Sequence, residues 1–326
     1  MVKKIRLSLG TAIELGLEEG ERDPNFSTIF LMIYQEGKCE ANCAFCPQAR
    51  DSRAASDRLS RISWPEYNLE VVLEHWPSPG KFRRICIQTI CYNEVVQDVV
   101  AIVHRVRRIS KLPISVAIHP ISTDEMKRLE LAGVSNIGIA IDACTPQLFD
   151  KIKGESRNSG YRWERHVKAL KNALKIFGKG RVTTHLIVGL GETEKDAVDF
   201  IFQMAKMGIT VGLFAFTNIK GTSLENNTQP SISSYRRIQA VRYLVEKGEL
   251  DIDDVAYNEE GDVMVKMDSS RVRKILSSST AFQVSGCKGC NRPFYNERPR
   301  GPMYNYPRPL NDDEIQNALE ESGLIR

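Results

Sequence analysis

The chain has 326 residues, a net charge of +4 and a hydrophobic content of 42%, which suffices for one large α/β domain with an appendage or for two ordinary domains. The charge is balanced too evenly, with 45 basic and 41 acidic residues, to indicate a nucleic-acid-binding protein. No apolar run reaches the roughly 18 residues of a membrane span, and no signal sequence follows the basic start. We therefore expect a cytoplasmic protein that binds neither nucleic acid nor a membrane.

Short apolar runs rich in β-branched residues recur along the first two thirds of the chain. They lie at 29–34, 85–90, 114–118, 134–141, 182–188 and 210–216. Their apolar residues are nearly continuous rather than alternating, which is typical of parallel strands buried on both faces. Segments with helical periodicity separate them, at 98–109, 122–132, 163–177 and 195–207.

This alternation of strands and helices predicts a parallel sheet with right-handed crossovers. Six units are fewer than a closed barrel needs, so we predict an α/β fold with a partial, TIM-like (β/α)6 barrel over residues 29–225. Its chemistry is expected at the carboxyl ends of the strands. Residues 1–28 are predicted to be a helical or irregular lead-in. Residues 226–326 are predicted to be a C-terminal extension, with a helix at 234–247 and a tail rich in Pro, Gly and Arg.

Three cysteines, Cys39, Cys43 and Cys46, follow the first predicted strand with the spacing Cys-x3-Cys-x2-Cys. Three thiolates on one iron–sulfur cluster leave one iron without a protein ligand, and that open position is where chemistry can occur. A structural zinc site is instead closed by four ligands. The sequence offers no fourth ligand nearby, so a zinc site completed from a distant segment is the alternative. Phe45, before the last cysteine, would shield a cluster from water.

This spacing, with an aromatic residue before the third cysteine, resembles the signature of the radical S-adenosylmethionine (SAM) superfamily. The resemblance implies a [4Fe-4S] cluster held by the three cysteines, with SAM bound to its open iron. One electron from a reductant such as ferredoxin would then cleave SAM to methionine and a 5′-deoxyadenosyl radical.

The same resemblance implies that residues around the strand ends bind SAM. They are Phe45, Gln88, Thr89, Asp142, Gly189, Gly191, Glu192, Phe216 and Asn218. The acidic Gly-Gly-Glu form usual in the superfamily is replaced here by Gln88-Thr89. Two alternatives stay open: Asp142 can cap the next helix, and Glu192 can stabilise a helix N-terminus.

A second set of cysteines consists of Cys86 and Cys91, across the second predicted strand, and Cys287 and Cys290 in the tail. We predict that both pairs close one site, which would hold an auxiliary [4Fe-4S] cluster. The alternatives are a zinc knuckle or free thiols for the tail pair, and a buried apolar role for Cys86. Cys144 is predicted to serve only packing.

The segments SLGTAIELGL, EGKCEANCAFCPQAR, ICIQTICYN and SGCKGCNRPFYNERPRG together resemble one component of the two-protein archaeal lipoyl synthases, a biotin-synthase-like group. The resemblance implies a sulfurtransferase of lipoate biosynthesis. It would insert sulfur at C6 or C8 of an octanoyl chain on a lysine of a carrier protein, taking sulfur from the auxiliary cluster. The implied partners are a second synthase component and the octanoylated carrier domain. The sequence does not indicate which insertion this chain performs.

Four tail arginines, Arg292, Arg298, Arg300 and Arg308, either attract an acidic carrier domain or are simply solvated loop charges. Two alternative functions remain open. One is another biotin-synthase-like enzyme acting on a free small molecule, although predicted strands 114–118 and 182–188 lack cysteine. The other is an electron-transfer or zinc-binding protein without catalytic activity.

Overall fold

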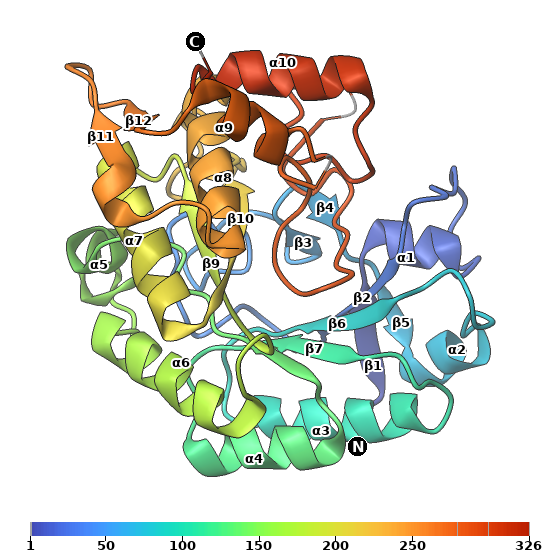
Figure 1. The fold of residues 1–326 in the computed structure, drawn as a ribbon. Coiled ribbons are helices and arrows are strands. Elements are labelled where there is room, and N and C mark those ends of the chain that lie inside the picture. Colours follow the sequence, from blue (N-terminus) through green and yellow to red (C-terminus); the bar gives the residue numbers. More distant parts are fainter. Residues whose placement is uncertain (1, 279, 299, 326) are drawn as a thin grey trace.

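The structure is a computed structural model that describes residues 2–278, 280–298 and 300–325. An eight-stranded sheet with the order β10-β9-β8-β7-β6-β2-β1-β5 forms its centre (Figure 1). The run of neighbours from β2 to β10 is parallel. Its strands are β2 (Thr28–Ile33), β6 (Arg84–Gln88), β7 (Ile114–Ala117), β8 (Asn136–Gly138), β9 (Val182–Val188) and β10 (Thr210–Ala215). The predicted partial barrel is thereby confirmed.

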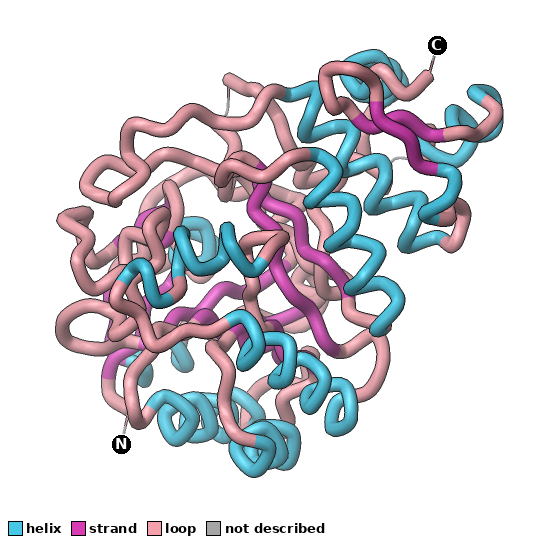
Figure 2. Tube along the Cα trace, turned by 90° about the vertical axis from the view of Figure 1, so that its left-hand side faces the viewer, coloured by secondary structure: helices cyan, strands magenta, loops and turns pink. Residues whose placement is uncertain are grey.

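Helices cover the outer face of these strands, and Figure 2 shows them along the lower and right-hand sides of the molecule. They are α3 (Val95–Arg107), α4 (Thr123–Ala132), α5 (Pro146–Lys153), α6 (Trp163–Phe177) and α7 (Glu194–Met207). In α3, Val99, Ile102 and Val106 lie on one stripe and are fully buried, as expected for an amphipathic helix on a sheet. No described helix has the length and apolar composition needed to cross a membrane.

The lead-in differs from its prediction because it contributes a strand to the sheet. Strand β1 (Lys4–Leu7) pairs antiparallel with β2 and also with β5 (Glu66–Asn68). Ile5 and Leu7 alternate with charged residues and are completely buried. Four residues are too few for periodicity to show in the sequence, which explains the error. Two short helices, α1 (Leu9–Glu14) and α2 (Leu69–Glu74), complete this edge.

The C-terminal extension has its own apolar cluster, which includes Val241, Leu244, Phe282 and Leu319. Its elements are α8 (Ile232–Lys247), β11 (Val255–Tyr257), β12 (Val263–Val265), α9 (Ser269–Leu276) and α10 (Asp312–Ser322). Helix α8 packs against α7, α10 and β10. The extension is therefore continuous with the barrel wall at α7 and β10.

The tail between α9 and α10 returns to the concave face of the sheet, opposite α3 and α4 (Figure 1). It meets a small hairpin made of β3 (Arg58–Leu59) and β4 (Ile62–Ser63). The Ser60 hydroxyl donates a hydrogen bond of 3.1 Å to the carbonyl of Tyr295, and Arg61 donates to the carbonyl of Glu297. Hairpin and tail together cover the open side of the partial barrel.

Candidate active site

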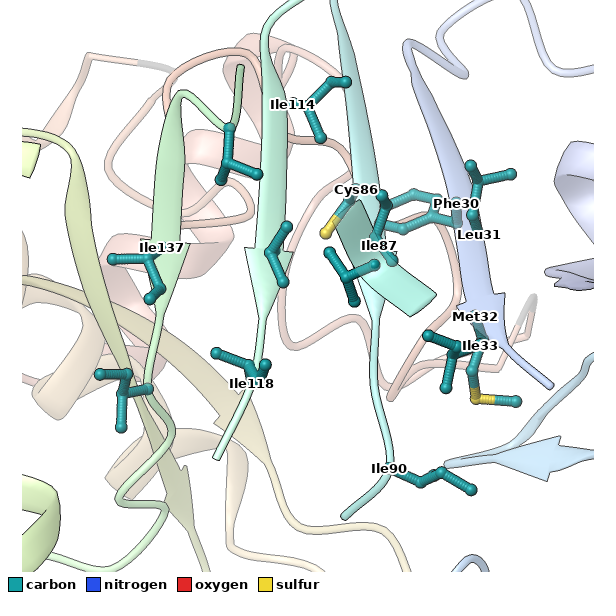
Figure 3. Packing of buried hydrophobic residues seen from close by; sticks show 14 of the residues in the cluster. Phe30, Leu31, Met32, Ile33, Cys86, Ile87, Ile90, Ile114, Ile118 and Ile137 are labelled. Atoms are coloured by element: carbon teal, nitrogen blue, oxygen red, sulfur yellow. The ribbon is translucent and has the colours of Figure 1, made fainter. Parts of the chain in front are cut away.

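A cavity of about 300 Å³ occupies the interior of the barrel. This volume is at the lower end of the range for small-molecule sites. Its wall follows the strand register, in which Phe30 on β2 lies opposite Cys86 on β6, and Cys86 lies opposite Ser115 on β7. Figure 3 shows Phe30 and Cys86 at the same level on neighbouring strands. Alternate residues of the buried strands thus face one enclosed space.

The loop cysteines, Cys39, Cys43 and Cys46, line the cavity near the carboxyl end of β2. Their loop is folded tightly on itself, since Cys39 N–H donates to the Gln48 carbonyl at 2.9 Å and Cys46 N–H donates to the Cys43 carbonyl at 3.1 Å. It is also tied to its surroundings, because Ala44 N–H donates to the Ile152 carbonyl at 2.8 Å. The loop cysteines therefore lie at the same cavity, beside the strand end after which the sequence places them.

Cys39 is buried, and Cys43 and Cys46 are partly buried. Desolvation raises the pKa of each thiol, that of Cys43 to about 12. The Lys153 ammonium lies near Cys43 and counteracts this rise. The backbone N–H of Cys91 donates a hydrogen bond of 3.0 Å to the Cys39 sulfur. Hydrogen bonds to cluster sulfurs tune the reduction potential of iron–sulfur clusters, so this donor suits a cluster ligand.

The donor set fits an iron–sulfur cluster. In the described part of the chain, no three His, Cys, Asp or Glu side chains are grouped as the ligands of a single metal ion are. A tetrahedral zinc site brings its sulfurs to about 2.3 Å from one ion, whereas a cubane distributes its thiolates over different irons. Three thiols around one end of a cavity therefore match a cluster with one open iron better than a mononuclear site.

Five of the residues expected to bind SAM line the cavity, and four do not. Those that line it are Phe45, Gln88, Thr89, Asp142 and Phe216. The others are Gly189, Gly191, Glu192 and Asn218.

The conformation of the loop after β9 is fixed by local contacts. The Glu192 carboxylate accepts hydrogen bonds from Gly189 N–H at 2.5 Å and from Leu190 N–H at 2.9 Å. Gly189 has φ +104°, and a Cβ there would lie only 2.8 Å from Pro230 Cδ. The glycine is thus required by backbone conformation and by a protein neighbour. Asn218 is exposed and donates to the Glu225 carbonyl at 3.2 Å.

Asp142 forms a buried ion pair that the sequence did not reveal. Lys153 Nζ lies 2.6 Å from Asp142 Oδ2 and 2.9 Å from the Ala140 carbonyl. Both side chains are less than a tenth exposed. Asp142 has φ +69° and its backbone bridges to β9, so its conformation is not that of a helix N-cap. Thr145 caps α5 instead. The ion pair fixes a carboxylate and an ammonium at the cavity wall.

The tail pair lies at the opposite end of the strands from the loop cysteines. Arg84, the first residue of β6, donates to the Lys288 carbonyl at 3.0 Å. The Ser115 hydroxyl donates to the Cys287 sulfur at 3.3 Å, and Arg292 donates to the Cys290 sulfur at 3.6 Å. Cys86, Cys287 and Cys290, here called the base cysteines, all line the cavity.

The predicted four-cysteine site requires a correction, because Cys91 does not join the base cysteines. Strand β6 ends at Gln88, and the chain then turns. The N–H of Cys91 donates to the Cys39 sulfur, and the carbonyl of Cys91 accepts a hydrogen bond from Glu40 N–H. The neighbours that affect Cys86 are instead Cys290 and Cys287. Three thiols and the Ser115 hydroxyl therefore make up the base site. Cys144 is 6% exposed and belongs to the apolar core, in line with its predicted packing role.

The four tail arginines have separate environments. Arg292 lies inside, over the Phe214 ring at 4.2 Å, so it is not a surface charge. Arg308 forms a bidentate pair with Glu314, with both distances 2.7 Å. Arg298 and Arg300 are exposed. Only the last two remain candidates for a surface role.

Sequence reasoning missed several polar residues of the cavity, namely Lys153, His119, Tyr161, His166 and His185. His185 lies within strand β9, and burial lowers its pKa to about 4. A polar residue inside an otherwise apolar buried strand is the signal that would have identified it. His166 lies on the buried stripe of α6, where a polar residue among apolar ones is again a signal. Tyr161 lies in the segment before that helix, where no pattern distinguishes cavity residues from surface residues.

Comparison with known proteins places this geometry in a family. The sequence profile of the radical SAM superfamily matches residues 37–204, just over half of the chain. Biotin synthase from Hydrogenobaculum sp. (strain Y04AAS1) is 23% identical over 221 residues, which cover 66% of this chain and 64% of that protein. Biotin synthase from Yersinia pseudotuberculosis serotype O:1b (strain IP 31758) is 26% identical over 223 residues, which cover 65% of this chain and 59% of that protein. The chain thus spans less than two thirds of the length of these relatives.

Solved structures agree at the level of the fold. The FeFe-hydrogenase maturase from Carboxydothermus hydrogenoformans superposes with a TM-score of 0.55 at 16% identity, over 92% of this chain and 67% of that chain. Methylornithine synthase superposes with a TM-score of 0.53 at 14% identity, over 68% of this chain and 63% of that chain. The chain belongs to the radical SAM superfamily, whose membership implies a [4Fe-4S] cluster and SAM, and within it resembles the biotin synthases.

Proposed function

We propose that this enzyme is a sulfurtransferase that inserts sulfur into an octanoyl chain on a lysine of a carrier protein, as one component of a two-protein lipoyl synthase. The observation that carries the proposal is that the loop cysteines and the base cysteines border the same cavity from opposite ends of the strands. A substrate held between them would lie within reach of both sites.

When bound by the loop cysteines, the [4Fe-4S] cluster and SAM supply a 5′-deoxyadenosyl radical able to abstract hydrogen from an unactivated carbon. The base cysteines would hold the auxiliary cluster from which sulfur is taken. Phe45 and Phe216 exclude water from the cavity, and the Lys153–Asp142 pair presents fixed charges to SAM. Gln88 donates to the Cys86 sulfur at 3.0 Å from between the two sites, so it orients that thiol.

The partners of this proposal are a second synthase component, the octanoylated carrier domain and a one-electron reductant such as ferredoxin. The cytoplasm is the proposed location, since thiol ligands of clusters require a reducing compartment.

Turnover by the anaerobically reconstituted protein tests the proposal. Octanoyl-lysyl peptide with SAM and dithionite should give a thiolated peptide, detected by mass spectrometry, together with 5′-deoxyadenosine. The double variant Cys287→Ala/Cys290→Ala should still cleave SAM but form no thiolated peptide. Release of 5′-deoxyadenosine without any thiolated peptide in the wild-type reaction would contradict the proposal.

A second candidate is a biotin-synthase-like reaction on a free small molecule, favoured by the sequence similarity to biotin synthases. It predicts that dethiobiotin or a similar small molecule is consumed, while the octanoyl peptide is not. An electron-transfer or zinc-binding protein predicts no release of 5′-deoxyadenosine with any reductant.

A further inference from the structure

One part of the cavity is lined by apolar residues from the N-terminal segment, from β2 and from the hairpin with the residue after it. We define this apolar arm by Gly10, Phe26, Phe30, Leu59, Ile62 and Trp64, all of which line the cavity. Phe30 begins it, because Phe30 is the direct neighbour of Cys86 across β2 and β6 (Figure 3). The arm therefore leads away from the place where sulfur chemistry is proposed.

The arm is built into the packing rather than left over from it. Phe26 and Phe30 stack edge to face with their ring centroids 6.2 Å apart. A Cβ at Gly10 would lie 2.7 Å from the Phe26 ring, so this glycine leaves room for that ring. Trp64 is 1% exposed and forms part of the wall next to the hairpin. Aromatic walls of this kind suit an unbranched aliphatic group and disfavour a charged one.

The outer end of the arm lies at the hairpin, where Leu59 and Ile62 are partly exposed. Arginines gather there. Arg58 is exposed on the hairpin. Arg298 is exposed on the tail, where it follows Glu297, whose carbonyl accepts the hydrogen bond from Arg61. Burial and the neighbouring Arg298 guanidinium lower the pKa of Arg61, so these two like charges lie close together.

The Glu297 carboxylate attracts Arg61, but its hydrogen bonds are made elsewhere. The Glu297 carboxylate turns inward and accepts hydrogen bonds from Asn305 N–H at 2.9 Å and Asn305 Nδ2 at 3.0 Å. Among the described residues, Arg58, Arg61 and Arg298 take part in no ion pair. A rim of unpaired guanidinium groups around an apolar opening matches an acidic surface that carries an apolar appendage.

We propose that the apolar arm is the route by which an aliphatic chain reaches the base cysteines, and that the acidic protein domain bearing this chain docks on Arg58, Arg61 and Arg298. The inference rests on the proposed function and specifies where its substrate binds. The apolar wall of the arm would favour the aliphatic chain, and the three arginines would favour the acidic domain that bears it. Each methylene buried in the arm should strengthen binding about fourfold, so an octanoyl chain should bind roughly fifteenfold tighter than a hexanoyl chain.

The test measures binding to the anaerobically reconstituted full-length enzyme without turnover. Three probes are titrated: an acidic carrier domain octanoylated on its lysine, the same domain without the acyl group, and a neutral octanoyl-lysine peptide. Ile62→Trp should weaken binding of both octanoylated probes at least tenfold and leave the unacylated domain unaffected. Leu59→Trp serves as a second variant that narrows the arm from the other strand of the hairpin.

The double variant Arg58→Glu/Arg298→Glu should weaken binding of the octanoylated domain at least tenfold at low salt. It should leave binding of the neutral octanoyl-lysine peptide unchanged. Lys171→Glu, an exposed charge on the outer helix α6, is the matched control and should bind all probes as the wild type does. The inference is overturned if the unacylated domain binds as tightly as the octanoylated one, or if neither tryptophan variant weakens the octanoylated probes. Binding through the arm without any thiolated product would instead refute the proposed function alone.

Discussion

Ser115 on β7 donates a hydrogen bond of 3.3 Å to the sulfur of Cys287, which follows it by 172 residues in the chain. Arg84 supports this contact, since it donates to the Ser115 hydroxyl at 2.6 Å and to Asn136 Oδ1 at 3.0 Å. Arg84 is 4% exposed, so its guanidinium is buried with its bonds satisfied. The barrel thus positions a tail cysteine through a polar network at the amino ends of its strands.

Removing the Ser115 hydroxyl should loosen this network. Ser115→Ala leaves Arg84 with one buried donor unpaired, so we expect the free energy of unfolding of the apo chain to fall by about 1–3 kcal/mol. Urea denaturation followed by circular dichroism measures this loss. Ser277→Ala, at an exposed position, should change the free energy of unfolding by less than about 0.5 kcal/mol. Equal effects of the two substitutions would argue against the network.

The base cysteines and Cys91 should differ in their effect on iron content. Cys86→Ala should lose about four irons per chain, the content of one cubane, while Cys91→Ala should keep them. The Cys91 bond to Cys39 comes from the backbone N–H, so alanine preserves it. Iron and acid-labile sulfide are measured after anaerobic reconstitution of both variants. Loss of about four irons in Cys91→Ala as well as in Cys86→Ala would restore the ligand assignment made from the sequence.

Predictability from the sequence followed the strength of the local pattern. The continuous apolar runs identified every strand from β2 to β10 in the parallel sheet, because strands buried on both faces need such runs. The loop cysteines were identified for a similar reason, since their spacing is local. The lead-in strand and the hairpin were missed, because runs of two to four residues carry no period.

The grouping of distant residues was the harder part. Cys86 and Cys91 are five positions apart, yet β6 ends between them and sends one to each end of the cavity. No pattern in the sequence distinguishes Lys153, yet it is 3% exposed and paired with Asp142. Both outcomes depend on tertiary packing, which sequence spacing does not encode.

The Lys153–Asp142 pair should be important for stability. Burial lowers the pKa of Lys153, but the Asp142 carboxylate together with Cys43 and Cys46 offsets this and holds the pKa above its ordinary value. Lys153→Met would leave the carboxylate buried without its partner, so we expect a loss of about 3–5 kcal/mol in the free energy of unfolding. Lys153→Met/Asp142→Asn should recover most of it, because asparagine tolerates the φ of +69° at this position. The free energy of unfolding of both variants is measured by urea denaturation. If the double variant is no more stable than Lys153→Met, the result contradicts the ion pair.

Acid should destabilise the protein through its buried histidines. His166 is 1% exposed, and burial lowers its pKa to about 3. A depressed folded-state pKa means that the unfolded chain binds the proton first. Its stabilising effect is therefore complete above the ordinary histidine pKa of about 6.5 and is lost as the pH falls from there, by about 1.4 kcal/mol per pH unit. His166→Phe should make the free energy of unfolding depend less on pH between the ordinary histidine pKa and the lowered pKa of His166. Denaturation at a series of pH values measures this dependence. An unchanged slope would show that His166 does not titrate in this way.

The central claim is that two iron–sulfur sites share one cavity. The iron and sulfide content of the wild-type protein after anaerobic reconstitution tests it most directly. Two cubanes require about eight irons per chain, and the double variant Cys287→Ala/Cys290→Ala should retain about four. A wild-type content of about four irons, unchanged in the double variant, would contradict the claim.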